Sequence, residues 1–246
     1  MLRFWSVVLA LFALSGGALA ESPTLKRIAE TGTLRIGYVP DAPPLSFKDE
    51  DGNVVGYSID LCRHIASAIR FDLGLEKINI EFMPLVSIEE RISAIEKGEV
   101  DIECGTSTVT LSRRERVDFT LMTFITGSAV LSRKDKPITT IDELDKKRIA
   151  VVTGTTTEDV VRRVAEVNDF RIKLTPIKVH NEGMELLNKG KVDGYASDRA
   201  MLIGQVFRNA NVANDYTMTR SALSFEPYAF MIARGDTEFR LAADRA

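Results

Sequence analysis

Small hydroxyl side chains followed by arginines mark the stretch "DIECGTSTVTLSRRERVDFT" at residues 101–120. In chain order, these hydroxyl and arginine residues are Thr106, Ser107, Thr108, Thr110, Ser112, Arg113, Arg114 and Arg116. Arginine keeps its positive charge at physiological pH and offers a planar fork of N–H donors that suits a carboxylate. The stretch is therefore either a solvated polar loop or an anion-binding site. For Arg114 and Arg116 we retain the first interpretation.

Three further positions could contribute to a polar ligand site, and each also has an ordinary structural interpretation. Asp198 follows a predicted buried strand and could supply a fixed negative charge, or it could cap the next helix. The stretch "GTTTE" at 154–158 begins a predicted helix and would direct free N–H groups outward, although threonine is also a common helix cap. His180 could donate to a ligand or could serve the fold alone. The residues by themselves leave these alternatives open.

The first twenty residues have the pattern of an export signal that is cleaved after Ala20. Arg3 provides the positive charge, an apolar run follows, and "ALA" at 18–20 supplies the small residues of a cleavage site. The apolar run is short for a membrane span, so an uncleaved anchor is the minor alternative. We therefore expect an exported protein.

Composition limits the partners and cofactors that this chain could use. Its charges are nearly balanced, with 32 Lys and Arg against 35 Asp and Glu, which gives no reason to expect nucleic acid or an anionic membrane as a partner.

Cys62 and Cys104 could form a disulfide bridge after export. Because their separation in space is unknown, we leave the bridge open and favour two buried thiols. Two cysteines and two distant histidines are too few for a metal site, and no cofactor is expected.

Strand and helix patterns alternate along the chain in two successive units. Apolar residues recur at helical spacing after the first predicted strand, and a further helix begins at Ser87, where Glu90 completes a capping box. The first unit comprises strands at 33–39, 78–85 and 100–104 and helices at 59–73 and 87–98. The second unit comprises strands at 148–154, 171–179 and 194–197 and helices at 155–167, 181–193 and 198–207.

These units predict an α/β protein of two lobes, each with a largely parallel sheet covered by helices. The expected division is a signal peptide at 1–20, a first lobe at 21–127, a second lobe at 128–222 and a return to the first lobe at 223–246. Extended segments near 124–133 and 222–233 are the candidate crossovers. Ligands of open α/β sheets bind beyond the carboxyl ends of the strands, and the polar stretches above fall at such positions.

Six segments in a defined order cover nearly the whole chain: "LRIGYVPDAPPLSF", "GNVVGYSIDLCRHIA", "AIEKGEVDIECGTSTVTLSRRERVDFT", "IDELDKKRIAVVTGTTTE", "GKVDGYASDRAML" and "SFEPYAFMIARGD". Together they resemble the family 3 extracellular solute-binding proteins, the periplasmic receptors of polar amino-acid ABC importers. The third segment and "VVTGTTTE" are most similar to the glutamate/aspartate receptors. The resemblance implies a type II periplasmic-binding-protein-like fold, in which extended hinge crossovers join two α/β lobes.

The resemblance also implies roles for individual residues. Arg113 stands where the family has the arginine that clamps the carboxylate of the ligand. Thr108 and Thr106 stand at positions that hydrogen-bond the same carboxylate. Asp198 matches the aspartate of the second lobe that pairs with the α-ammonium group. Thr156 matches a further ligand contact in that lobe.

A second group of implied positions concerns the side chain of the ligand. Arg91 and His180 fall where the glutamate/aspartate receptors place residues near that side chain, and Tyr57 is expected to help frame the cleft. Val39 stands where those receptors carry another arginine, and Leu45 stands where an aromatic residue is common. Loss of one cation weakens the expectation of glutamate or aspartate and favours a smaller, neutral or mixed specificity.

The function implied is capture of an L-amino acid between the lobes by hinge closure. A monomer without catalytic activity would deliver the ligand from the periplasm to an ABC permease in the inner membrane. One alternative is a cleft enzyme of the same fold, similar to cyclohexadienyl or arogenate dehydratases, with its acid or base among Glu103, Glu158 and His180. The other alternative is a soluble ligand sensor for a signalling receptor. The chain ends at "RLAADRA", so we expect shortened C-terminal helices.

Overall fold

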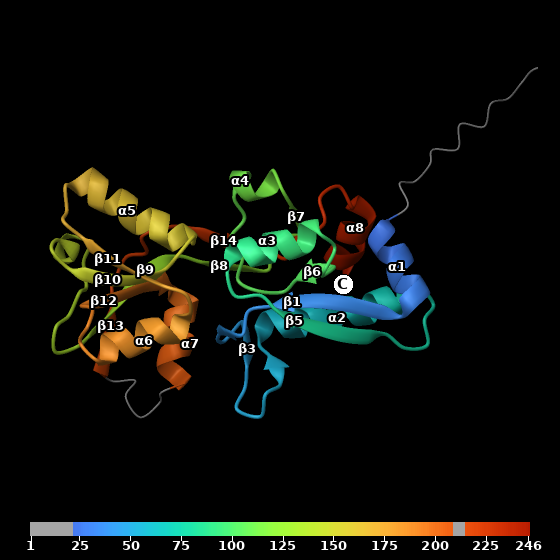
Figure 1. The fold of residues 1–246 in the computed structure, drawn as a ribbon, viewed down its shortest axis with the longest axis horizontal. Coiled ribbons are helices and arrows are strands. Elements are labelled where there is room, and N and C mark those ends of the chain that lie inside the picture. Colours follow the sequence, from blue (N-terminus) through green and yellow to red (C-terminus); the bar gives the residue numbers. More distant parts are fainter. Residues whose placement is uncertain (1–21, 209–214) are drawn as a thin grey trace, which may run out of the picture.

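The computed structural model describes residues 22–208 and 215–246 and consists of two α/β lobes that lie side by side (Figure 1). The export signal predicted at 1–20 lies outside the described residues. Among the helices that the structure describes, none is both long and apolar enough to cross a membrane. The predicted two-lobe α/β architecture is confirmed, with one five-stranded sheet in each lobe.

The first lobe is built on a sheet with the strand order β5-β1-β6-β15-β7. These strands are β1 (Thr33–Tyr38), β5 (Asn79–Pro84), β6 (Ile102–Glu103), β7 (Asp118–Phe119) and β15 (Met231–Ile232). β1 runs parallel to β5 and β6, whereas β15 is antiparallel to β6 and β7. The end of the chain therefore returns to the first lobe, where it forms α8 (Thr237–Arg245).

Two helices of the first lobe, predicted at 59–73 and 87–98, begin and end within two residues of those bounds. α2 (Tyr57–Asp72) buries one face, formed by residues such as Ile59, Ile65 and Ile69, against the sheet. α3 (Ile88–Glu96) begins with the predicted capping box, in which the Ser87 side chain accepts from the Glu90 backbone and the Glu90 side chain accepts from the Ser87 backbone. Apolar burial at helical spacing and satisfied end groups together stabilise both helices.

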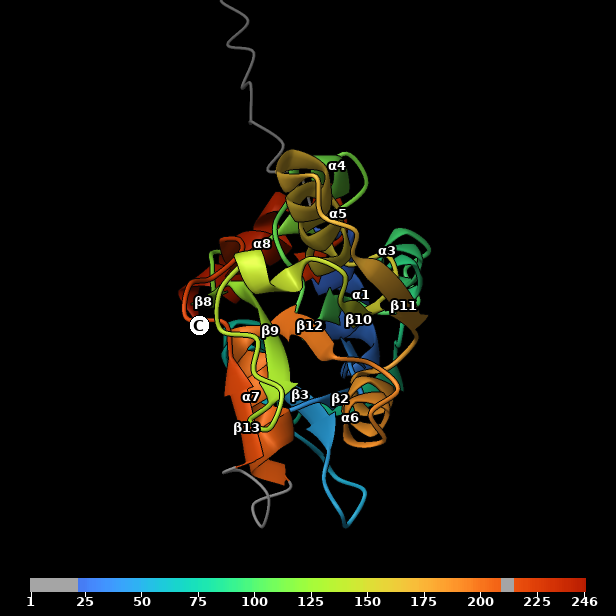
Figure 2. The same ribbon diagram turned by 90° about the vertical axis from the view of Figure 1, so that its left-hand side faces the viewer.

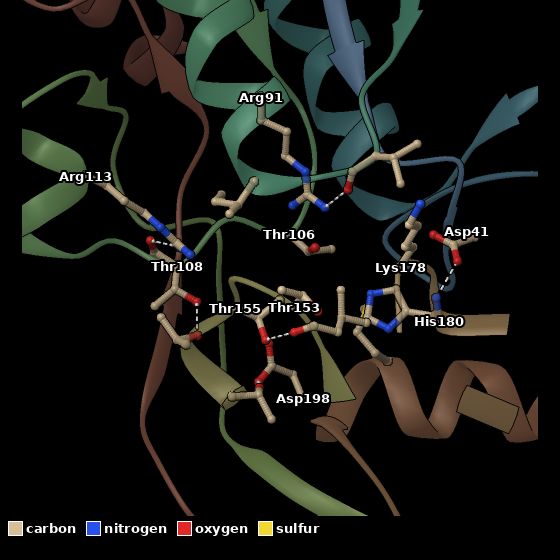
Figure 3. Close-up of a pocket in the computed structure, with 16 residues that line it drawn as sticks. Asp41, Arg91, Thr106, Thr108, Arg113, Thr153, Thr155, Lys178, His180 and Asp198 are labelled. Carbon is tan, nitrogen blue, oxygen red and sulfur yellow. Dashed lines mark hydrogen bonds between the residues drawn. The ribbon is translucent and has the colours of Figure 1, made fainter. Parts of the chain in front are cut away.

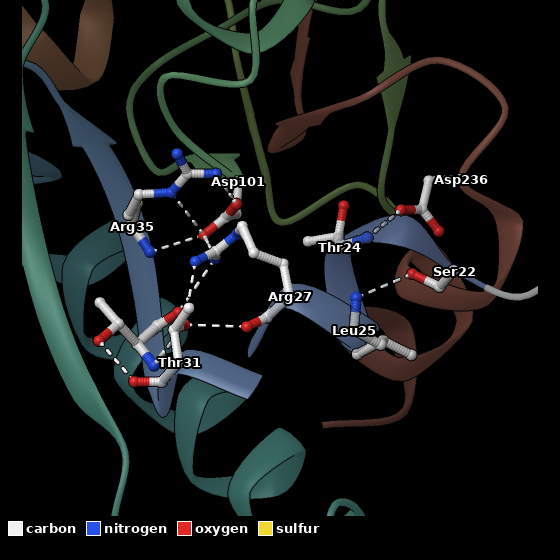
Figure 4. A network of polar contacts seen from close by, with 9 residues as sticks. Ser22, Thr24, Leu25, Arg27, Thr31, Arg35, Asp101 and Asp236 are labelled. Carbon is white, nitrogen blue, oxygen red and sulfur yellow. Dashed lines mark hydrogen bonds and ion pairs between the residues drawn. The ribbon is translucent and has the colours of Figure 1, made fainter. Parts of the chain in front are cut away.

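A helix that the pattern analysis did not predict, α1 (Pro23–Thr31), is held to the first lobe by polar contacts (Figure 4). Ser22 caps it by accepting from the Leu25 backbone N–H at 3.0 Å. Asp101 forms ion pairs with Arg27 of this helix and with Arg35 of β1, the latter at 2.7 Å. These contacts tie the start of the described chain to the loop that precedes β6.

The proline-containing loop after β1 forms a small antiparallel sheet of its own. Its strands are β2 (Asp41–Ala42), β3 (Ser46–Lys48) and β4 (Val54–Val55). The sequence predicted only that this segment is not helical, which is confirmed. β2 packs against two helices of the second lobe, so this small sheet is part of the contact between the lobes.

The second lobe is built on a sheet with the strand order β11-β10-β12-β9-β13. These strands are β9 (Ser128–Arg133), β10 (Arg148–Val152), β11 (Lys173–Ile177), β12 (Gly194–Asp198) and β13 (Tyr216–Met218). Figure 2 shows α5 (Thr156–Asn168) on one side of this sheet and α6 (His180–Asn188) and α7 (Arg199–Arg208) on the other. Because β10, β11 and β12 are parallel, their carboxyl ends share one edge, and that edge faces the first lobe.

Two short antiparallel strands connect the lobes. β8 (Phe124–Thr126) pairs with β14 (Glu226–Tyr228), with Thr126 opposite Glu226. They lie between the two large sheets in Figure 1, within the extended segments that the sequence suggested as crossovers. The pair is the hinge through which the chain leaves the first lobe and returns to it.

Cys62 and Cys104 form a disulfide, with their Cα atoms 6.4 Å apart. Our preference for two separate thiols was wrong. Cys62 lies on the buried face of α2, and Cys104 directly follows β6, on which that face packs. Helical spacing predicted that Cys62 is buried, but it did not predict which strand the buried face would meet.

Candidate functional site

A small cavity lies between the lobes and is lined by residues from both of them (Figure 3). It encloses about 40 Å³. The predicted site residues that line it are Arg91, Thr106, Thr108 and Arg113 of the first lobe and Thr156, His180 and Asp198 of the second. The cavity also borders the carboxyl ends of β10 and β12, as expected for ligand sites of open α/β sheets.

Arg113 reaches the cavity from α4 (Leu111–Arg114), a single turn that Thr110 caps through the Arg113 backbone N–H. Its guanidinium Nη1 donates to the carbonyl oxygen of Thr108 at 2.7 Å, and this bond holds the side chain against the first lobe. Burial lowers the pKa of Arg113, and the nearby Arg91 lowers it further. Because an arginine remains charged under such shifts, Arg113 presents a partly desolvated cation. Its neighbour Arg114 is exposed and does not line the cavity.

Asp198 lies opposite the arginines, at the end of β12 (Figure 3). Its carboxylate accepts from Ser128 Oγ at 3.0 Å, from Thr157 Oγ1 at 3.3 Å and from the Tyr228 hydroxyl. These donors are side chains, so Asp198 is held as a buried acceptor rather than as a cap of α7. Burial raises the pKa of Asp198 to about 6, and the carboxylate of Glu226 contributes to the increase.

Arg91 and His180 lie in the part of the cavity away from Thr108 (Figure 3). Arg91 is buried and donates from Nη2 to the Val86 carbonyl at 3.0 Å, while its Nε has no hydrogen-bond partner among the described residues. His180 Nδ1 lies 2.5 Å from the Tyr195 hydroxyl. Burial lowers the pKa of His180, so its ring is neutral at neutral pH. The guanidinium of Arg91 lines the cavity and is a cationic donor that a ligand could use.

Pattern analysis missed Asp41 and Lys178, which line the same part of the cavity. Asp41 of β2 accepts the backbone N–H of His180 at 2.6 Å, so a carboxylate of the first lobe caps α6 of the second. No local pattern indicates this contact, because the two residues are 139 positions apart in the chain. Asp41 adds negative charge to a cavity whose other charged groups are mainly cationic.

The charges that line the cavity are arranged for a zwitterion. Arg113 can pair with a carboxylate from one lobe and Asp198 with an ammonium group from the other. Within residues 22–208 and 215–246, no group of three or more His, Cys, Asp or Glu side chains is placed to hold a metal ion.

Comparison with known sequences identifies the family. The family model of the bacterial extracellular solute-binding proteins, family 3, matches residues 34–246. This chain belongs to that family. It is 32% identical over 224 residues to the L-glutamate/L-aspartate-binding protein of Pseudomonas aeruginosa, covering 91% of this chain and 74% of the relative. It is 30% identical over 240 residues to the glutamate/glutamine/aspartate/asparagine-binding protein of Rhodobacter capsulatus, covering 96% of this chain and 68% of the relative.

A solved structure supports the same assignment for this solute-binding protein. An ancestral arginine-binding protein bound to glutamine superimposes with a TM-score of 0.76 and 30% sequence identity. The match covers 87% of this chain and 89% of that chain. Both the sequence relatives and the structural neighbour therefore share nearly the whole described fold, including the two lobes that enclose the cavity.

Tyr57 does not line the cavity of this solute-binding protein. Its side chain is 43% exposed, its hydroxyl donates to the Thr123 carbonyl at 2.9 Å, and its ring packs against Phe124 of the hinge. That Tyr57 helps to frame the cleft therefore stays a prediction. The start of α2 directs the phenol toward the crossover strand instead of toward the ligand site.

The acidic residues named for an enzyme do not form a pair at the cavity. Glu103 is fully buried, accepts from Ser107 Oγ at 2.8 Å and has a raised pKa because burial disfavours its charge. Glu158 accepts from the Gly154 backbone and pairs with Arg162 on the surface of α5. Neither side chain lines the cavity, so His180 is the only one of these three candidates that does.

Binding of a zwitterionic amino acid is expected to weaken on acidification, because Asp198 must be ionised to pair with ammonium. With a pKa of about 6 in the ligand-free protein, affinity should be roughly tenfold lower at pH 5 than at pH 7. Stability changes in the opposite direction: the folded carboxyl holds its proton more tightly than the unfolded one, so the ligand-free protein loses stability as pH rises from 3.8 to about 6. Calorimetric titration and thermal melting measure the two effects.

His180→Gln is the control for that pH dependence, because His180 lines the same cavity and burial lowers the pKa of its ring. The slope of affinity against pH should persist in this variant. Loss of the slope would assign the titration to His180 rather than to Asp198.

Proposed function

We propose that this protein is the substrate-binding component of an amino-acid ABC importer and that it binds an L-amino acid between its lobes. The observation that carries the proposal is the position of Arg113 and Asp198, which line one cavity from different lobes. An α-amino acid has a carboxylate for the first and an ammonium group for the second. The names of the two relatives, both amino-acid-binding proteins, support this assignment.

Binding proceeds by closure of the lobes about the β8–β14 hinge. Ligand sites usually enclose several hundred cubic ångströms, whereas the cavity between these lobes encloses about 40 Å³. The lobes must therefore move apart before an amino acid can enter. Because the carboxylate and ammonium partners come from different lobes, the ligand interacts fully only with the closed state and shifts the population toward it.

The side chain of the ligand is expected to be polar and to lie beside Arg91. The guanidinium of Arg91, which lines the cavity, can donate to a carboxylate or to a carboxamide oxygen. Val39 provides no second cation after β1, and Asp41 adds a negative charge nearby. This balance supports a mixed specificity for acidic and amide side chains rather than for dicarboxylic amino acids alone.

Several further properties follow from this proposal. The protein is exported to the periplasm, acts as a monomer without catalysis and presents its closed state to a permease in the inner membrane. Its lobes comprise residues 21–127 and 128–222, and residues 223–246 return to the first lobe. The contacts of β15 and α8 with the first lobe support this last boundary.

A thermal-shift screen against the twenty common amino acids tests the proposal. A ligand that binds only the folded protein raises the melting temperature by mass action, with about 2.7 kcal/mol of stabilisation at a concentration of 100 Kd. We expect the largest increases with glutamate, glutamine, aspartate and asparagine. If no amino acid shifts the melting temperature, the proposal fails. Turnover of an arogenate-type substrate would favour the cleft enzyme instead.

A further inference from the structure

A buried carboxylate at the hinge, that of Glu226, connects the two lobes through side-chain hydroxyls. Glu226 begins β14 and is 2% exposed. Its Oε2 accepts from Thr108 Oγ1 at 2.7 Å and from Thr156 Oγ1 at 2.8 Å, and its Oε1 accepts from Ser224 Oγ at 2.6 Å. Thr108 belongs to the first lobe and Thr156 to the second. Because a buried carboxylate is costly without such donors, Glu226 depends on both lobes for its hydrogen bonds.

These bonds determine the direction of the two threonine hydroxyls. A hydroxyl donates one proton and accepts through two lone pairs. Since both protons are directed at Glu226, Thr108 and Thr156 can offer only lone pairs to the cavity that they line. Lone pairs suit an ammonium group, which only donates, and they repel a carboxylate. The two hydroxyls are therefore oriented to receive the ligand's ammonium group, together with Asp198.

We propose that Glu226 is a positioning residue for the ligand site, acting through the hydroxyls of Thr108 and Thr156; this inference rests on the proposed amino-acid receptor. Closure brings both hydroxyls to one carboxylate oxygen, and opening of the hinge separates them because they belong to different lobes. Glu226 thus stabilises the closed state and, in the same contacts, directs two acceptors toward the ammonium group. The family resemblance implied that Thr108 serves the carboxylate, and the Glu226 contacts reassign its hydroxyl to the ammonium group.

A double-mutant cycle with Glu226→Gln and Thr156→Val tests this role. The probes are L-glutamate and L-glutamine, titrated calorimetrically into the wild type, each single variant and the double variant. Glu226→Gln should weaken binding at least roughly tenfold, because the neutral amide accepts more weakly than the carboxylate from the hydroxyl on each lobe. Because Glu226 acts through Thr156 as well as Thr108, the loss in the double variant should be smaller than the sum of the two single losses. The radius of gyration of the ligand-free protein, from small-angle scattering, should increase in Glu226→Gln.

Each outcome of the cycle has a definite meaning. Additive losses would show that Glu226 acts through the effect of its charge on Arg113 or through the stability of the fold, and would overturn the positioning role. Unchanged affinity in Glu226→Gln would also overturn it. If the wild type binds none of the amino acids, the proposed function fails, and this inference fails with it. Should Glu226→Gln not fold, Thr108→Val combined with Thr156→Val removes both hydroxyls from Glu226, and an unchanged affinity in that variant would overturn the proposal.

Discussion

Replacement of Arg113 by alanine is expected to weaken amino-acid binding by roughly 2–4 kcal/mol, or about 30-fold to 700-fold in Kd. The guanidinium is held in place by the Thr108 carbonyl and faces a cavity of about 40 Å³. Truncation would leave the carboxylate of the ligand desolvated and without its ionic partner. Titration calorimetry with L-glutamate and L-glutamine measures the change.

Two matched variants make this prediction specific. Arg114→Ala removes the same charge from the next residue, which is exposed and does not line the cavity, and should change affinity by less than about threefold. Arg113→Lys retains the charge but loses the planar fork and should recover only part of the affinity. Equal losses in Arg113→Ala and Arg114→Ala would point to a general effect of charge and would remove Arg113 from the site.

Loss of the Cys62–Cys104 disulfide is expected to lower the free energy of unfolding by about 4 kcal/mol in the chain-entropy model. The bridge closes a loop of 42 residues that contains most of α2, β5 and α3. Without it, the unfolded chain gains the conformational freedom of that loop. Urea denaturation of the Cys62→Ala, Cys104→Ala double variant measures the difference, and the wild type under reducing conditions provides a second measurement of the same change.

The location of the bridge predicts a weaker effect on binding than on stability. Cys104 precedes Gly105 and Thr106, and the Gly105 carbonyl also accepts from Ser58 Oγ of α2 at 2.9 Å. This hydrogen bond remains in the double variant and continues to hold the loop near the cavity. Unchanged stability in the double variant would contradict the prediction, as would a loss of ligand affinity without a loss of stability.

Secondary structure followed from local chemistry and was largely predictable. The spacing of Ile59, Ile65 and Ile69 is the burial pattern of α2, and the Ser87–Glu90 capping box marks the start of α3. Such signals operate within a few residues, so a single sequence contains them completely. α1 was not predicted from the sequence. Its start signal, Ser22 before Pro23, directly follows the predicted export signal.

The site could be predicted only as a set of separate positions. Motif order placed Arg113, Asp198, Thr156 and His180 at the ends of strands and helices, and the structure brings these residues to one cavity. Resemblance also placed Tyr57 there, but its contacts with Thr123 and Phe124 direct it to the hinge. A matching position thus indicates where a residue lies in the chain, while the neighbouring side chains decide where it points.

The sequence by itself determined the α/β class, the order of the elements and the arginine that faces the cavity, since these depend on local periodicity and on recognisable motifs. Only the tertiary structure revealed the contacts of Glu226 and Asp41 and the Cys62–Cys104 bridge. Glu226 meets Thr108 across 118 residues and Asp41 meets His180 across 139. A carboxylate has the same local pattern whether it is solvated or buried between lobes. Its partners are decided by how the two sheets are brought together, which no short stretch of sequence encodes.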